Sequence, residues 1–306
     1  MKIKTISLIL LIFPFNSIAE SYSYQMQTQP HNGKEIHYYL IQKGTAKSKN
    51  LLVLIQGSDC KSVVNNPDMV KNFGAAFPNN DILLVEKTGL TDQIGQNNEE
   101  VEQANCPVEY MKNDSPLERA ENYISVLNQL KDHYQQIILL GGSEGAVVTN
   151  IIVSKVDYIK ASIALNLGGR YFIDDVIYSI KNNTPAEYVS ESVDGFKQFA
   201  QAAKDKQLDE NQFVSSHGPT WWYESLTIDN QSLIQSIKTP HLVIQTMVDI
   251  NVDAHNAQRM MKNNTNTKVS FKSYEGLDHF FKDDKGKSQT SMIVTDIQSW
   301  YQSINH

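Results

Sequence analysis

Ser143 stands in a motif typical of a catalytic serine. The motif is Gly141-x-Ser143-x-Gly145, and it follows the apolar run Ile137–Leu140 and precedes a segment with helical potential. This is the spacing of a nucleophile elbow, a sharp strand-to-helix turn that lifts a serine hydroxyl clear of the backbone. The two glycines let strand and helix approach closely. The motif predicts that Ser143 attacks a carbonyl group, although the same spacing also occurs in glycine-rich turns without chemistry.

Such a serine needs a base, and the best-placed base is His279. A histidine in this role is expected after the last strand of the sheet, which the pattern places at Lys268–Tyr274. The only other histidine beyond that strand is His306, at the end of the printed sequence. We therefore predict that His279 removes the proton of Ser143.

The base in turn needs an acid that holds it in its working tautomer. Asp249 follows the apolar strand His241–Thr246 and is the preferred candidate, with Asp253 as a rival four residues later. Asp278 is adjacent to His279, but the side chains of neighbouring residues diverge. The predicted triad is therefore Ser143, Asp249 and His279.

Strands and helices alternate along most of the chain. Helices are expected at 66–77, from Ser115, at 254–262 and at 288–301, and a hairpin with an Asn-Gly turn is expected within 22–42. Buried strands are expected at Leu51–Ile55 and Asp81–Glu86. Further strands are expected before Ser143 and at Ile159–Leu167, His241–Thr246 and Lys268–Tyr274. This alternation predicts an α/β fold with a mostly parallel sheet covered on both sides.

The order Ser143, Asp249, His279, with separations of 106 and 30 residues, resembles that of the α/β-hydrolase superfamily. The likeness covers nearly the whole chain and is greatest to secreted bacterial hydrolases of the esterase, dienelactone-hydrolase-like and prolyl-peptidase-like group. It implies an α/β-hydrolase fold and hydrolysis through an acyl-enzyme, without a cofactor.

The resemblance also implies an oxyanion hole. Gln56-Gly57-Ser58 occupies the place where many relatives carry His-Gly-x, so the backbone N–H groups of Ser58 and Glu144 are the expected donors. Gln56 departs from the usual histidine. Arg170 is expected to pair with Glu144 and brace the elbow, with substrate recognition as the alternative.

The regular alternation lapses between Gly168 and Lys238. We expect a small helical cap at about 170–238, lying over the carboxyl ends of the strands. Trp221, Trp222 and Tyr223 are predicted to bind the substrate, although they could equally attach the cap to the core.

Residues 1–19 have the pattern of a secretory signal peptide. Lys2 and Lys4 precede an apolar run that ends in Ser17-Ile18-Ala19, so the hydrolase domain is expected to span 20–306. The run is too short for a membrane anchor. The protein is therefore expected in the periplasm or outside the cell.

Two cysteines, Cys60 and Cys106, are expected to form a disulfide in an exported protein. Two free buried thiols are the alternative. Without residues 1–19, 287 residues remain, with 25 basic and 34 acidic side chains and a formal charge of −9. This balance gives no basic stripe for nucleic acid, and the sequence has no H-E-x-x-H or phosphate-loop motif, so no metal is expected.

These features together predict an exported serine hydrolase that cleaves a carboxylic ester in a small or peptide-like acyl substrate. The closest alternative is a peptidase or amidase with the same triad, because fold resemblance does not choose between ester and amide. A non-catalytic binding protein with this fold is the third possibility, and the intact triad argues against it.

Overall fold

The structure is a computed structural model that describes residues 24–43, 47–96, 101 and 105–304. The predicted signal peptide at 1–19 lies outside the described residues. Within these ranges, no helix combines the length and the apolar character needed to cross a bilayer.

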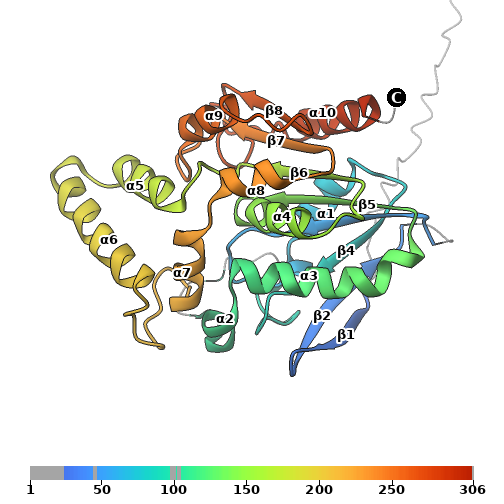
Figure 1. Cartoon of the computed structure of the whole chain (residues 1–306), viewed down its shortest axis with the longest axis horizontal. Coiled ribbons are helices and arrows are strands. Elements are labelled where there is room, and N and C mark those ends of the chain that lie inside the picture. Colours follow the sequence, from blue (N-terminus) through green and yellow to red (C-terminus); the bar gives the residue numbers. More distant parts are fainter. Residues whose placement is uncertain (1–23, 44–46, 97–100, 102–104, 305–306) are drawn as a thin grey trace, which may run out of the picture.

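An eight-stranded sheet forms the centre of the molecule (Figure 1). Its order is β1-β2-β4-β3-β5-β6-β7-β8, and every neighbouring pair from β4 onward is parallel. The strands are β1 (Met26–His31), β2 (Lys34–Ile41), β3 (Asn50–Ile55), β4 (Asp81–Val85), β5 (Gln136–Gly142), β6 (Ala161–Leu165), β7 (His241–Thr246) and β8 (Val269–Tyr274). The predicted mostly parallel sheet is confirmed.

The predicted hairpin at the edge of the sheet is also confirmed. His31 pairs with Lys34, which leaves Asn32 and Gly33 as a two-residue turn with φ values of 49° and 78°. Two consecutive positive φ angles favour Asn-Gly in such turns.

Helices cover both faces of the sheet (Figure 1). α1 and α10 pack on one face, while α3, α4 and α8 pack on the other. The helices are α1 (Pro67–Gly74), α2 (Val108–Asn113), α3 (Pro116–Leu130), α4 (Glu144–Lys155), α5 (Phe172–Asn183), α6 (Val189–Lys204), α7 (Pro219–Thr227), α8 (Asn230–Ser236), α9 (Ala254–Lys262) and α10 (Thr290–Ser303).

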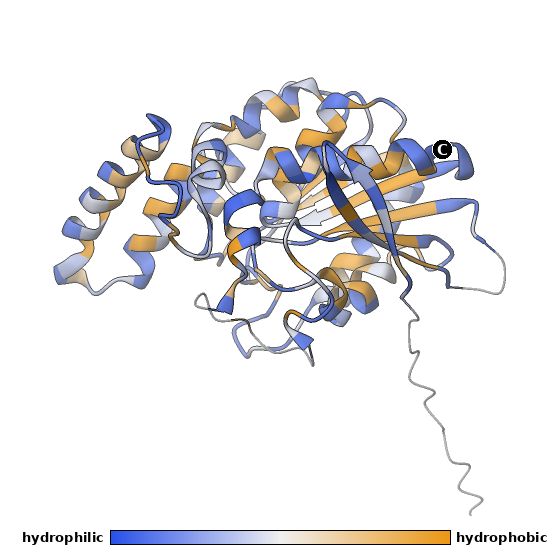
Figure 2. Cartoon of the chain, turned by 90° about the horizontal axis from the view of Figure 1, so that it is seen from below, coloured by the Kyte–Doolittle hydropathy of each residue, from blue (hydrophilic) through white to orange (hydrophobic). Residues whose placement is uncertain are grey.

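The core has two layers because the central strands are buried on both faces. In β3, Val53 packs into the layer that contains α3 and α4, and its neighbour Leu52 packs into the layer that contains α1 and α10. Figure 2 shows the central strands largely in the colour of hydrophobic residues. Burial of these continuous apolar runs is the main favourable contribution to folding.

Residues 172–236, between β6 and β7, fold as α5 to α8, and we call this segment the cap. Its three-helix part, α5 to α7, extends to one side of the sheet (Figure 1). This part has an apolar cluster of its own, centred on Ala200, Ala203, Trp221, Trp222 and Leu226. The α5 to α7 part of the cap therefore has its own core, while α8 packs on the sheet.

The predicted disulfide is present. Cys60 and Cys106 are bonded, with a Cα–Cα distance of 5.8 Å across 46 residues. The bridge joins the loop after β3 to the segment that begins α2, and it packs against Leu90 and Tyr110. It therefore fixes two loops that lie in separate parts of the sequence.

Removing the bridge with Cys60→Ala and Cys106→Ala together should lower the free energy of unfolding by about 4 kcal/mol, because the unfolded chain regains the entropy of a 46-residue loop. Urea denaturation of the oxidised protein and the double variant measures the difference. If reductant leaves the unfolding midpoint of the wild type unchanged, the bridge does not contribute as described.

Candidate active site

The elbow around Ser143 has the close approaches that its glycines predict. Ser143 joins β5 to α4 with φ 55° and ψ −125°, a strained conformation for a residue other than glycine. A Cβ on Gly141 would lie 2.1 Å from the carbonyl oxygen of Gly145. A Cβ on Gly145 would lie 2.2 Å from the carbonyl oxygen of Ile55. Side chains at either position are therefore excluded by backbone atoms.

His279 and Asp249 form a hydrogen-bonded pair. The distance between His279 Nδ1 and Asp249 Oδ2 is 2.6 Å, and the Asp249 side chain is fully buried. The second carboxylate oxygen of Asp249 accepts the backbone N–H groups of Asn251 and Val252 at 2.8 and 3.1 Å. Asp253, the rival acid, instead caps α9 by accepting the N–H of Asn256. Asp249 thus holds the position that the triad needs.

Strand β6 brings the serine and the histidine to the same place. The Ser143 N–H donates to the carbonyl of Leu165 at 2.8 Å. The next residue, Asn166, donates from its side-chain amide to the His279 carbonyl at 2.9 Å. Among the described residues, the Ser143 hydroxyl makes no hydrogen bond to His279. In free enzymes such catalytic bonds are often long and tighten only when substrate is bound.

A pocket that is partly open to solvent lies beside Ser143. Its lining is mostly apolar and comes from the elbow, the loop after β3 and the cap. The lining residues are Ser58, Pro116, Ser143, Glu144, Val147, Leu167, Phe172, Asp175, Trp221, Ser225, Ile228, Asn230 and Val252. The predicted residues Ser58, Ser143, Glu144 and Trp221 are thus brought together at one pocket.

The three predicted substrate aromatics have different environments. Trp221 lines the pocket. Trp222 lies inside the cap, where its indole N–H donates to the Val214 carbonyl and its ring packs edge-on against Phe199. Tyr223 is half-buried on the cap and lies under the Lys206 ammonium group. Of the three rings, Trp221 therefore lines the pocket, and Trp222 packs in the interior of the cap.

Ser58 and Glu144 have backbone positions suited to an oxyanion hole. Glu144 is the first residue of α4, so its N–H has no acceptor within the helix. The loop of Ser58 lies against the nucleophile, since a Cβ on Gly57 would be 3.5 Å from the Ser143 Cβ. Both residues line the pocket next to Ser143.

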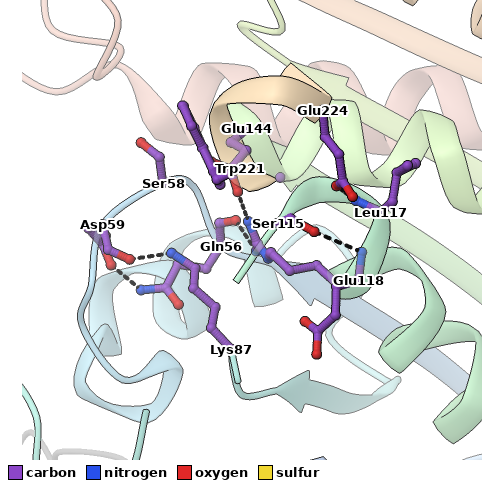
Figure 3. A network of polar contacts seen from close by, with 12 residues as sticks. Gln56, Ser58, Asp59, Lys87, Ser115, Leu117, Glu118, Glu144, Trp221 and Glu224 are labelled. Carbon is purple, nitrogen blue, oxygen red and sulfur yellow. Dashed lines mark hydrogen bonds and ion pairs between the residues drawn. The ribbon is translucent and has the colours of Figure 1, made fainter. Parts of the chain in front are cut away.

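Side chains fix the loop of Ser58 by binding its carbonyl groups (Figure 3). Lys87 donates to the Asp59 carbonyl. Tyr110 donates to the Ser58 carbonyl at 3.1 Å. Gln56 donates to the Asp59 carboxylate at 2.5 Å and to the Lys61 carbonyl at 2.9 Å. Gln56 therefore supports the loop in the place where many relatives carry histidine.

Arg119 connects the start of α4 to the loop after β3. Its Nη1 pairs with Glu144 Oε1 at 2.5 Å, and its Nη2 donates to the Gln56 carbonyl at 2.6 Å. Burial on its own would raise the pKa of Glu144, but the positive charges of Arg119 and Lys87 outweigh burial and lower it. Glu144 is therefore an ionised, buried partner of Arg119.

The predicted pair of Arg170 and Glu144 is wrong. Arg170 forms a two-pronged ion pair with Asp229, with its Nη2 at 2.7 Å from Oδ2, on an exposed part of the cap. Arg119 reaches Glu144 instead because α3 packs directly on α4.

The cap reaches the elbow through Trp221. Its indole N–H donates at 2.8 Å to Glu144 Oε2, the carboxylate oxygen that does not pair with Arg119 (Figure 3). The ring of His217 stacks on the ring of Trp221, with 3.7 Å between the ring centroids. Burial lowers the pKa of His217 to about 4, so this imidazole is neutral at neutral pH.

Arg119, Lys87 and Tyr110 were not predicted as site residues. Arg119 could have been found, because it shares the buried face of α3 with Tyr123, Val126 and Leu130. An arginine on the apolar side of a helix needs a buried anion or several acceptors. The sequence does not reveal that Glu144 is that anion.

The comparisons with known proteins agree with this fold. Residues 116–283 match the profile of the BAAT / acyl-CoA thioester hydrolase C-terminal family. The protein belongs to this family. The matched segment covers more than half of the chain and includes Ser143, Asp249 and His279. No curated protein matches the sequence.

Solved structures of hydrolases share this fold, which is the α/β-hydrolase fold that the resemblance predicted. Est1E from Butyrivibrio proteoclasticus has a TM-score of 0.58 and 13% identity, over 91% of this chain and 98% of its own. The Pyrococcus furiosus esterase Pf2001 has a TM-score of 0.53 and 12% identity, over 92% and 93%. Pyrococcus horikoshii acylaminoacyl peptidase has a TM-score of 0.58 and 12% identity, over 94% of this chain and 42% of its own.

At these identities the structural likeness concerns the fold, which is that of hydrolases.

In the part of the chain that the structure describes, no group of three His, Cys, Asp or Glu side chains is placed to hold a metal ion.

Proposed function

We propose that the protein is a serine hydrolase that cleaves carboxylic esters through an acyl-enzyme. The proposal rests on the buried hydrogen bond between Asp249 and His279. Asn166 donates to the His279 carbonyl, and its neighbour Leu165 accepts the backbone N–H of Ser143 at the elbow. A serine, an imidazole and a carboxylate in this order constitute the machinery of acyl transfer.

In the first half of the reaction, His279 takes the hydroxyl proton of Ser143 while Oγ attacks the carbonyl carbon. Asp249 accepts the Nδ1–H of His279 and stabilises the imidazolium that forms. The N–H groups of Ser58 and Glu144 donate to the developing oxyanion, at the positive end of α4.

The tetrahedral intermediate then expels the alcohol, which takes the proton from His279, and the acyl group stays on Ser143 Oγ. In the second half, His279 deprotonates a water that attacks the acyl carbon. The carboxylic acid is released, and Ser143 recovers its proton. No electrons are gained or lost, and no cofactor takes part.

The mostly apolar pocket supports an acyl substrate with an uncharged body. The name of the family adds acyl-CoA thioesters as a second candidate, because the same triad can cleave them through the same acyl-enzyme. The test is a panel of para-nitrophenyl esters of increasing acyl length, acyl-CoA thioesters, and aminoacyl and peptidyl amides. We expect the highest kcat/KM with an ester. A higher value for an amide would replace the ester assignment, and turnover of none would favour a binding protein.

Export is part of the proposal and rests on the predicted signal peptide at 1–19. Protein recovered from a Gram-negative host with a periplasm should begin at Glu20 and lie in the periplasm or medium. Amino-terminal sequencing and fractionation measure this. A chain that keeps Met1 and remains in the cytoplasm would contradict export.

The variant Arg119→Lys tests the proposed oxyanion hole. Lysine keeps the positive charge beside Glu144 but does not provide the fork that also reaches the Gln56 carbonyl. We expect kcat for the best ester to fall about tenfold or more with little change in KM, because oxyanion donors act in the transition state.

The matched control is Arg170→Lys, which breaks a similar fork to Asp229 on the cap. It should leave kcat within about twofold of the wild type. Equal effects of the two variants would remove Arg119 from the support of the oxyanion hole.

A further inference from the structure

Two residues that line the pocket each have one buried side-chain atom without a hydrogen-bond partner. Ser225 and Asn230 are 8% and 4% exposed, yet Ser225 Oγ and Asn230 Oδ1 make no hydrogen bond within the described residues. Both residues line the pocket. Buried polar groups are nearly always hydrogen-bonded, so each unpartnered atom requires an explanation.

The two residues come from consecutive helices of the cap. Ser225 lies in the last turn of α7, and Asn230 is the first residue of α8, with a short connection between the two helices. The Asn230 amide is oriented by its own bond, since Nδ2 donates to the Gly169 carbonyl at 3.1 Å. Its Oδ1 is therefore an acceptor, and the Ser225 hydroxyl can donate or accept.

The two carboxylates of the pocket are already bound to the protein. Glu144 receives Arg119 and Trp221, as described above. Asp175 accepts the backbone N–H of Asp253 at 2.8 Å and that of Gly169 at 3.1 Å. Both carboxylates therefore already accept hydrogen bonds from the protein.

In the proposed mechanism, the pocket would receive the acyl side of the substrate. It contains the two proposed oxyanion donors, and His279 is not among the residues that line it. In the proposed mechanism the leaving group takes its proton from His279, so it lies outside this pocket. The acyl chain is the part that extends under the cap.

We propose that the acyl group of the substrate carries a hydroxyl, alcoholic or phenolic, and that Ser225 and Asn230 bind it. This inference rests on the proposed function. One hydroxyl can donate to Asn230 Oδ1 and accept from the Ser225 hydroxyl, which satisfies both unpartnered atoms. A plain acyl chain leaves them buried and unpaired, which is unfavourable for polar groups removed from water.

The test compares para-nitrophenyl esters in matched pairs: hexanoate with ω-hydroxyhexanoate, and phenylpropanoate with its para-hydroxy derivative. In at least one pair, kcat/KM of the wild type should be about tenfold or more higher for the hydroxylated ester. Ser225→Ala should lose most of this preference and keep the rate with the plain ester. Its melting temperature should not fall, because the hydroxyl that is removed has no partner in the free enzyme.

Asn230→Ala should abolish the preference as well, and thermal unfolding separates that effect from any loss of folding. The matched control is Ser190→Ala, an exposed serine on α6, which should retain the preference. Equal kcat/KM within both pairs, or an unchanged preference in Ser225→Ala, would overturn the inference while ester hydrolysis stands. A preference for ω-aminohexanoate over both other hexanoates would overturn it in favour of a cationic acyl group. Failure of every ester would instead refute the proposed function.

Discussion

Ser143→Ala should lower kcat for the best ester by about 10³-fold or more, because the variant has no group that can form the acyl-enzyme. The pocket and the oxyanion donors remain, so KM should change little. Initial rates at saturating ester measure the effect, with the wild type at the same concentration as the reference.

The matched control is Ser154→Ala, at the far end of the same helix, where the serine hydroxyl donates to the Ile151 carbonyl. It should retain wild-type activity. A Ser143→Ala variant that is folded and turns over within tenfold of the wild type would show that Ser143 is not the nucleophile.

Asp249→Asn should lower kcat by about 10³–10⁴-fold, because an asparagine amide no longer stabilises the imidazolium and favours the wrong tautomer of His279. The variant keeps the volume of the buried side chain and its contacts to the loop at 251–252. The fold should therefore persist, and the loss should fall on kcat.

Asp253→Asn provides the control within the same loop. Asp253 caps α9, and asparagine is an equally good residue for that position, so activity should change by less than about threefold. If Asp253→Asn proved the more damaging of the two, the acid of the triad would have to be reassigned.

The sequence was most informative where the steric requirement is local. The elbow glycines, the Asn-Gly turn and the buried strands each follow from contacts within a few residues, and the structure has all of them. The order of Ser143, Asp249 and His279 could be read because parallel strands present their carboxyl ends at one edge of the sheet.

Partners across the fold could not be predicted in the same way. Glu144 pairs with Arg119 because of how α3 packs on α4, which no local pattern reveals. Adjacent aromatics on α7 point in different directions, since neighbours on a helix do not share a face. Trp221 therefore faces the pocket while Trp222 fills the cap.

Labelling with a fluorophosphonate tests the central claim most directly, because this probe reacts with a serine only when its base and oxyanion hole are assembled. Intact-mass analysis of the wild type should give one adduct per chain, and peptide mapping should assign it to Ser143. Ser143→Ala should give none. Equal labelling of that variant, or a folded wild type that gives no adduct, would contradict the proposed serine mechanism.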